Sequence, residues 1–231
     1  MIKYLIHKIP QKLTYFEEKT ITGYLNLYNY SLLRMEEDIL KNIDRYTLDG
    51  IALVSVLSIL GHPFKRNSPD FGSYFQELFK ECEIQQKSIF FVGGSIEEIK
   101  LFLETIREEF PKLIISGYHH GYFNYRENQS ICDEIRKENP SIAIIGLGTP
   151  KQESFAILLK DLGYSGSIYT CGAFISQTAL AGRNFYPKYI NKFNLRWLYR
   201  IFKEKKHLKR YFVLYPKALI ILLIDYFSGR N

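Results

Sequence analysis

The sequence has few cysteines and no motif for a structural metal. Its three cysteines, Cys82, Cys132 and Cys171, are odd in number and far apart, and none forms a C-x-x-C pair. Disulfide frameworks and zinc sites both need sets of such ligands at characteristic spacings, so neither is expected. The N-terminal residues, MIKYLIHKIPQK, also lack the apolar core and small-residue cleavage site of a signal peptide. We therefore expect a protein of the reducing cytosol.

Long apolar runs are missing as well. A membrane-spanning helix needs about 20 apolar residues. Near the C-terminus, the apolar run at 218–224 has seven residues and is flanked by Lys217 and Asp225. We expect this segment, within residues 211–227, to be an interfacial anchor. The aromatic content of 16%, with 18 Tyr and 17 Phe, is consistent with a surface that meets a membrane.

Positive charge is concentrated at one end of the chain. Of the 31 Lys and Arg, 12 lie within 183–231, together with only 2 of the 24 Asp and Glu, which gives that segment a local charge of +10 and the rest −3. With 231 residues and 46% hydrophobic residues, the chain fits one large folded domain or one domain with an appendage. We predict an α/β catalytic core at 1–182 and a basic, amphipathic, membrane-associating appendage at 183–231.

From residue 87 onward, apolar strand-like runs alternate with amphipathic helical segments. The strand-like runs are 87–94, 113–123, 141–148 and 167–174, and the helical segments begin at Ser95, Glu127 and Lys151. Earlier in the chain the pattern is weaker, and it predicts a helix at 29–42, an extended segment at 46–50 and a helix at 53–60. The alternation predicts an α/β fold with a Rossmann-like, mainly parallel sheet and helices on both faces, plus a basic helical C-terminal appendage.

Ligands of such sheets bind beyond the carboxyl ends of the strands, so the loops that follow strands are the candidate sites. Gly93-Gly94-Ser95 follows one strand and opens a helix, where backbone amides can hold a phosphate or a sugar hydroxyl. An ordinary strand-to-helix turn explains the two glycines equally well. The segment 146–153, GLGTPKQE, has the same position and adds Lys151 and Gln152 as donors near a helix N-terminus. It is typical of a nucleotide-diphosphate cradle, or of a plain capped helix start.

Asp49-Gly50 follows an extended segment. A carboxylate at a strand end can accept the proton of an incoming hydroxyl and so act as a general base. The Asp-Gly pair is equally a common turn dipeptide. The chain contains neither a Walker A loop nor a G-x-G-x-x-G motif, which argues against ATPase and dinucleotide-binding functions.

Together, the motifs resemble the WecG/TagA/CpsF family of bacterial glycosyltransferases. The resemblance extends from about residue 22 to residue 211, and GLGTPKQE is its most specific part. The matching pieces are YLN at 24–26, DGI at 49–51, GHP at 61–63, FFVGGS at 90–95, GYHHGYF at 117–123, GLGTPKQE at 146–153, CGAF at 171–174 and RWLYRIFKEKKHLKRY at 196–211.

The resemblance implies an inverting, metal-independent and cofactor-free transfer of a sugar, typically an N-acetylhexosamine, from a UDP-sugar to a polyprenyl-diphosphate-linked acceptor. It implies a peripheral position on the cytoplasmic face of the membrane, in bacterial surface polysaccharide synthesis. Asp49 matches the family's proposed base. The predicted substrate-binding residues are Asn26, Arg66, Gly93, Gly94, Gly148, Lys151, Gln152, Glu153, Arg196, Arg200 and Arg210, and no metal ligand is expected.

Some positions depart from the family's pattern. Ile175 stands where an Asp is common, Phe185-Tyr186-Pro187 replaces R-A-P, and Arg196 replaces the Glu before Trp197. These changes leave the donor and acceptor sugars open. Besides the UDP-sugar and the lipid-linked acceptor, the expected partners are an anionic membrane surface and, as an open alternative, a second copy of the chain, but no nucleic acid. The competing hypotheses are a basic nucleic-acid-binding module, suggested by aromatics among the C-terminal cations, and a non-catalytic nucleotide-sugar-binding homologue.

Overall fold

A parallel β-sheet forms the centre of the protein. The computed structural model describes residues 1–182 and 207–228. Within them, six strands pair in the order β2-β1-β6-β5-β3-β4, and every pairing is parallel. The strands are β1 (Ile21–Leu25), β2 (Arg45–Leu48), β3 (Ser88–Gly93), β4 (Ile114–His119), β5 (Ile142–Gly146) and β6 (Ser167–Thr170). The predicted Rossmann-like parallel sheet is confirmed.

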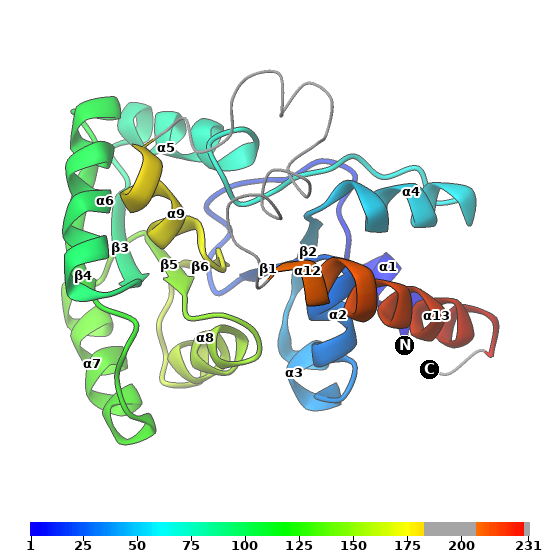
Figure 1. Ribbon diagram of the computed structural model, residues 1–231. Coiled ribbons are helices and arrows are strands. Elements are labelled where there is room, and N and C mark those ends of the chain that lie inside the picture. Colours follow the sequence, from blue (N-terminus) through cyan, green and yellow to red (C-terminus); the bar gives the residue numbers. More distant parts are fainter. Residues whose placement is uncertain (183–206, 229–231) are drawn as a thin grey trace.

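Helices cover both faces of the sheet, because alternate strand residues point to opposite sides. One face packs on α5 (Tyr74–Gln85), α6 (Ile96–Glu109) and α9 (Phe174–Ala181). The other packs on α1 (Ile2–His7), α2 (Leu27–Leu33), α3 (Glu37–Asn42), α4 (Ile51–Ile59), α7 (Asn128–Glu138), α8 (Lys151–Asp161) and α13 (Tyr215–Phe227). In β3, Phe90 and Val92 join the second group while Ile89 and Phe91 join the first. Figure 1 shows α6 and α9 on one side of the sheet and α3 and α8 on the other.

Two sequence predictions need correction. The single helix expected at 29–42 is two helices, α2 and α3. α2 starts earlier than expected, at the cap formed by Asn26. It ends in tight turns, in which the backbone amides of Met35 and Glu36 donate to carbonyls three residues back. The strand expected at 167–174 ends at Thr170. Gly172 turns the chain there with φ of +58°, and Phe174 already begins α9.

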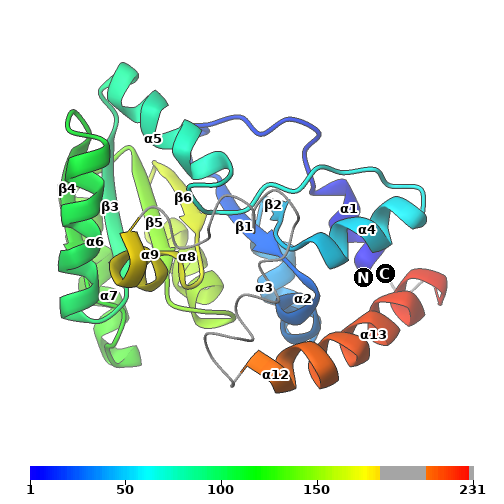
Figure 2. The same cartoon turned by 45° about the horizontal axis from the view of Figure 1, so that its top comes forward.

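The C-terminal helix α13 packs against α2 and α1, and Figure 2 shows it beside α2 at the edge of the molecule. Its Ala218 and Leu222 are buried in the same core as the strands. It is preceded by a short turn of helix, α12 (His207–Lys209), and a π-helical turn, η3 (Arg210–Leu214). The division of the chain at residue 182 stays a prediction, and most of the basic segment lies outside the described residues. Within 1–182 and 207–228, no helix combines the length and apolar character needed to cross a bilayer.

The direction in which the chain leaves each strand determines where the candidate site lies. The chain leaves β3 into α6 on one face, whereas it leaves the neighbouring β5 into α8 on the other. The same divergence occurs between β6, followed by α9, and β1, followed by α2. Loops that part in this way open a crevice at the carboxyl edge of a parallel sheet, which is where such folds bind ligands.

Candidate functional site

Glycines bring four neighbouring strand ends into close contact. A Cβ on Gly93, at the end of β3, would lie 2.7 Å from the carbonyl oxygen of Gly146 on β5. A Cβ on Gly146 would lie 2.8 Å from the carbonyl oxygen of Gly172, after β6, and a Cβ on Gly172 would lie 2.4 Å from the hydroxyl of Tyr24 on β1. No side chain fits at these positions without displacing its neighbour. Gly93 is among the binding residues predicted from the sequence. Gly146 lies in the predicted GLGTPKQE cradle and Gly172 in the CGAF motif, but neither is among the predicted binding residues.

A hollow of about 210 Å³ lies at this glycine-rich edge. It is lined by Gly94, Gly121, Tyr122, Gly146, Leu147, Gly148, Gly172, Ala173 and Ser176. The predicted binding residues Gly94 and Gly148 are thus on its wall, whereas Gly93 is not one of its lining residues. A lining made largely of backbone beside helix N-termini offers amide donors to an anionic or hydroxyl-rich ligand.

Lys151 holds the loop that carries Tyr122. Its Nζ lies 3.3 Å from the carbonyl oxygen of Gly121 and 3.2 Å from that of Phe123, and it sits 4.1 Å from the centroid of the Phe123 ring. Gly121 N also donates to Gly94 O at 2.7 Å, which ties this loop to the one after β3. Burial lowers the pKa of Lys151. The side chain of Tyr122, between the two held carbonyls, is 77% exposed at the rim of the hollow.

Gln152 and Glu153 lie beneath the hollow and have no exposed surface. Gln152 Oε1 accepts a hydrogen bond from Gly172 N at 3.0 Å, and Gln152 Nε2 donates to Glu153 Oε1 at 2.8 Å. Thr149 Oγ1 donates to the same Glu153 oxygen at 3.1 Å. Burial raises the pKa of the Glu153 carboxyl, against the opposing effect of these hydrogen bonds. The two side chains therefore brace the wall of the hollow from below.

Asp49 and Asn26 come together at the ends of β2 and β1. Asp49 N donates to Leu25 O at 2.7 Å, which aligns the two strand ends. Asn26 is buried and caps α2: its Oδ1 accepts from the backbone amides of Tyr28 and Asn29 at 3.0 Å each. Because Oδ1 is engaged, Nδ2 is the part of Asn26 that can donate to a ligand.

The segment that follows α4 folds back over Asp49. Asn67 N donates to Leu48 O at 2.9 Å, and the hydroxyl of Ser68 donates to Asp49 Oδ1 at 2.7 Å. Arg66 lies in this segment, two residues before Ser68, and is partly buried. The predicted base and the predicted arginine are therefore brought into the same neighbourhood.

The two halves of the predicted site share one edge of the sheet but not one hollow. Asp49 does not line the glycine-rich hollow. Three strand spacings of about 4.8 Å each separate the ends of β2 and β5, roughly 14 Å in all, with Tyr24 and Gly172 between them. Arg196 and Arg200 lie outside the described residues, and the backbone of Arg210 lies in η3. Within the described parts of the chain, no cluster of three or more His, Cys, Asp or Glu residues is grouped to hold a metal ion.

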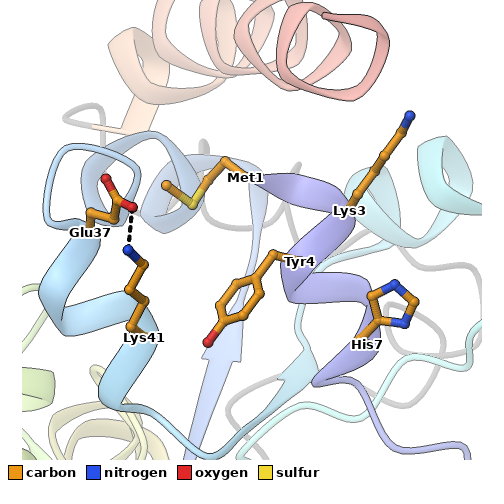
Figure 3. A pocket seen from close by; sticks show the side chains of 6 residues that line it. All are labelled: Met1, Lys3, Tyr4, His7, Glu37 and Lys41. Carbon is orange, nitrogen blue, oxygen red and sulfur yellow. Dashed lines mark ion pairs between the residues drawn. The ribbon is translucent and has the colours of Figure 1, made fainter. Parts of the chain in front are cut away.

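A second hollow, of about 440 Å³, lies between α1 and α3. Figure 3 shows its lining residues: Met1, Lys3, Tyr4, His7, Glu37 and Lys41. The Lys41 amine pairs with the Glu37 carboxylate at 2.6 Å on one side of it. No strand end reaches this hollow, so it is separate from the candidate active site.

The outward side of α13 is mostly apolar and also carries the exposed Lys217. Exposed residues repeat at helical spacing along it and the turn before it: Val213, Pro216, Ile220, Ile224 and Phe227. The opposite side is anchored by Asp225, whose carboxylate accepts hydrogen bonds from Arg34 and Tyr30 of α2. A helix with one apolar side on the core and another toward solvent presents a surface for a further apolar partner.

Several site residues escaped the sequence interpretation. Ser68 is hidden in the irregular segment RNSPD and only the fold brings it to Asp49. Tyr122 lay inside the predicted strand-like run 113–123, although Gly121 signals a turn there. Ser176 donates to Glu98, which caps α6, so that α6 and α9 are joined at the hollow.

Comparisons with known proteins agree on one family. A profile described as "Glycosyl transferase WecG/TagA/CpsF family" matches residues 13–231. The chain is 34% identical over 224 residues, 95% of its length and 94% of the relative's, to a UDP-Gal:alpha-D-GlcNAc-diphosphoundecaprenol beta-1,4-galactosyltransferase of Shigella boydii. It is 25% identical over 194 residues (81% and 71%) to the N-acetylglucosaminyldiphosphoundecaprenol N-acetyl-beta-D-mannosaminyltransferase of Bacillus spizizenii, and 26% identical over 186 residues (80% and 71%) to that of Bacillus subtilis.

Proposed function

Because the chain belongs to the WecG/TagA/CpsF family of glycosyl transferases, we propose that it transfers a sugar from a UDP-sugar to a polyprenyl-diphosphate-linked acceptor in bacterial surface polysaccharide synthesis. The observation that supports this most is the shared sheet edge: a strand-end carboxylate, Asp49, lies on the same carboxyl edge as a glycine-lined hollow suited to a nucleotide diphosphate. The nucleic-acid-binding alternative is not favoured, since the relatives are sugar transferases.

The donor nucleotide belongs in the glycine-rich hollow. Its backbone lining and the N-termini of α6, α8 and α9 place partial positive charge where a diphosphate needs it. The exposed Tyr122 ring at the rim offers a face on which a uracil can stack. Lys151 contributes by fixing this loop through the carbonyls of Gly121 and Phe123.

The acceptor hydroxyl belongs next to Asp49. In an inverting transfer, its oxygen forms a bond to the anomeric carbon while the bond from that carbon to the UDP oxygen breaks. UDP leaves with the bonding electron pair, and the hydroxyl proton passes to the Asp49 carboxylate. The Ser68 hydroxyl holds one carboxylate oxygen and so directs the other toward the acceptor. Amides around the hollow, together with cationic side chains such as Arg66, stabilise the negative charge that develops on UDP.

The acceptor's lipid chain requires contact with a membrane. The apolar outward side of α13 can enter the interfacial region of a bilayer, and each basic residue near an anionic leaflet adds about 1 kcal/mol of attraction. We propose that the protein binds peripherally through α13 and the basic segment before it, on the cytoplasmic face. This keeps the acceptor's diphosphate within reach of Asp49.

The proposed chemistry is tested by measuring UDP release with undecaprenyl-diphosphate-linked GlcNAc as the acceptor and UDP-galactose or UDP-N-acetylmannosamine as donors. We expect turnover with one donor class and a loss of at least about 100-fold in kcat for Asp49→Asn, the lower end of what a positioned base contributes. Asp133→Asn is the matched control, because Asp133 is exposed and, among the described residues, its ion pair is with the exposed Arg136 on α7. Equal rates for wild type and Asp49→Asn would remove Asp49 from the mechanism.

A further inference from the structure

Glu153 is a buried carboxyl without a balancing cation in the described structure. It lies in the first turn of α8 and has no exposed surface. Its Oε1 accepts hydrogen bonds from Thr149 and Gln152, whereas its Oε2 has no hydrogen-bond partner among the described residues. An ionised carboxylate in such a place would cost several kcal/mol of solvation, so the neutral acid is favoured. Such a residue cannot touch a substrate in the hollow above it.

The surroundings of Glu153 are neutral as well. One titratable group that interacts with Glu153 is the phenol of Tyr46, on β2, whose hydroxyl is also buried without a partner among the described residues. Burial, together with the charge that Glu153 would carry, raises the pKa of Tyr46, so the phenol keeps its proton. Tyr46 therefore supplies no positive charge that would draw the proton off Glu153.

Glu153 determines how the amide of Gln152 is oriented. Both hydrogen bonds to Glu153 end on Oε1, so the proton of the neutral acid belongs on Oε2. Oε1 then only accepts, and it faces the NH₂ end of the Gln152 amide at 2.8 Å. This turns the carbonyl end of Gln152 to the backbone N–H of Gly172, at 3.0 Å. If the amide were reversed, two donors would face each other at Gly172, and at Glu153 the Gln152 oxygen would face Oε1, which carries no proton while the proton is on Oε2.

Gly172 links the orientation of the Gln152 amide to the shape of the hollow. It lines the hollow directly, and its Cα packs against the Tyr24 hydroxyl on the side toward Asp49. We propose that Glu153 is a positioning residue that acts in its protonated form: it fixes Gln152, and through Gln152 the turn at Gly172 that shapes the donor site. The inference deepens the proposed function, since it assumes that the hollow binds the UDP-sugar.

The test compares Glu153→Gln, which copies the protonated acid in shape and hydrogen bonding, with Glu153→Ala. UDP affinity is measured by calorimetry, and the exchange rate of the Gly172 amide hydrogen by NMR. We expect Glu153→Gln to match wild type within about twofold in both. We expect Glu153→Ala to weaken UDP binding about 10-fold or more and to speed exchange at Gly172. A Glu153→Gln protein as impaired as Glu153→Ala would overturn the role of the protonated form.

A double-mutant cycle with Gln152→Ala separates positioning from general stability. If Glu153 acts through Gln152, the double variant binds UDP no more weakly than Gln152→Ala alone. Fully additive losses would refute the coupling. Should Glu153→Ala fail to fold, Glu153→Met, which keeps the volume without an acceptor, takes its place. If the Glu153→Met protein does not fold either, Glu153→Ser is used in its place.

Two readouts remain valid even if the protein does not bind UDP. Exchange at Gly172 is one. The other is the carbonyl stretch of a protonated carboxyl, seen in the infrared difference between wild type and Glu153→Gln. The absence of UDP binding by wild type would contradict the proposed function but not the role of Glu153. The absence of that band would contradict the protonated state.

Discussion

Arg34 and Asp225, 191 residues apart in the chain, form a two-pronged ion pair between α2 and α13: Nε and Nη2 of Arg34 each donate to a different oxygen of the Asp225 carboxylate. The Tyr30 hydroxyl donates to it as well, at 2.7 Å. Asp225 is 1% exposed. Because Asn26 caps α2, this pair connects the C-terminal helix to an element that is joined to the candidate site.

Asp225→Asn is expected to destabilise the protein by about 3 to 5 kcal/mol, since it leaves the partly buried Arg34 without its counter-charge. Burial raises the pKa of Asp225, but the hydrogen bonds from Arg34 and Tyr30 outweigh it and hold the pKa below its ordinary value. A carboxyl whose pKa is lowered by folding stabilises the protein at any pH above its pKa in the unfolded chain. This stabilisation is lost as the pH falls through its pKa in the folded protein. Urea unfolding between pH 3 and 7 should therefore show that the free energy of unfolding falls more steeply toward low pH for wild type than for the variant. Parallel curves would contradict this role.

Ser68→Ala is expected to lower kcat about 10-fold and to leave the affinity for UDP unchanged. The Ser68 hydroxyl contacts Asp49 and not the glycine-rich hollow, so its loss frees the carboxylate to rotate away from the acceptor. Steady-state kinetics and calorimetry measure the two effects. Ser130→Ala, at an exposed position on α7, is the control. A weaker UDP affinity with unchanged kcat would place Ser68 elsewhere in the mechanism.

Gly172→Ala should weaken UDP binding, whereas Gly163→Ala should not. Both glycines have positive φ, +58° and +92°, so both substitutions carry a strain of about 1 to 2 kcal/mol. A Cβ at Gly163 meets nothing within 4 Å, but one at Gly172 collides with Tyr24. Melting temperatures should fall for both, and calorimetry with UDP should separate them. Similar affinities for the two variants would show that the close contact does not shape the donor site.

Lys151→Met is expected to raise the KM for the UDP-sugar several-fold with a smaller change in kcat. The variant keeps the aliphatic stem over Phe123 but loses the bonds to two carbonyls, so the loop bearing Tyr122 is released. Tyr122→Ala should reproduce the effect, and the double variant should add little to it. Independent, additive losses would indicate that Lys151 contacts the donor directly.

Ile220→Asp is expected to reduce binding to vesicles that contain anionic lipid while leaving UDP affinity intact. Ile220 is 59% exposed on the outward side of α13, so a charge there opposes insertion without disturbing the core. Ile84→Asp is the matched control, since Ile84 is 73% exposed on α5. Vesicle flotation measures binding. An equal effect of both changes would show that α13 is not the contact surface.

The sequence was most informative where the elements are regular. The alternation after residue 87 predicted β3, β4, β5, α7 and α8 to within a few residues, and the capping box at Ser95 and Glu98 is present. These elements have strong local signals: buried apolar strands between helices with clear N-termini. The same alternation of strands and helices led to the prediction that ligands bind at the carboxyl edge of the sheet.

Elements whose formation depends on distant partners were missed. β1, with the sequence ITGYL, has Gly23 in its centre and looks weak by itself. Gly23 is needed because the Tyr46 ring of β2 lies on it, and a Cβ there would approach that ring to 2.9 Å. α9 was assigned in part to a strand, since Phe174 and Ile175 are apolar in either structure. The contact of Ser68 with Asp49 likewise depends on the path of an irregular segment, which no local pattern encodes.

The place of α13 in the chain also has a consequence for biosynthesis. α2 leaves the ribosome long before α13, which packs on it, because Asp225, the partner of Arg34, is translated 191 residues later. At about 5 to 20 residues per second, that interval is roughly 10 to 40 s. During this time the residues of α2 that contact α13 in the folded protein lack that partner, so this part of the core is completed only at the end of synthesis.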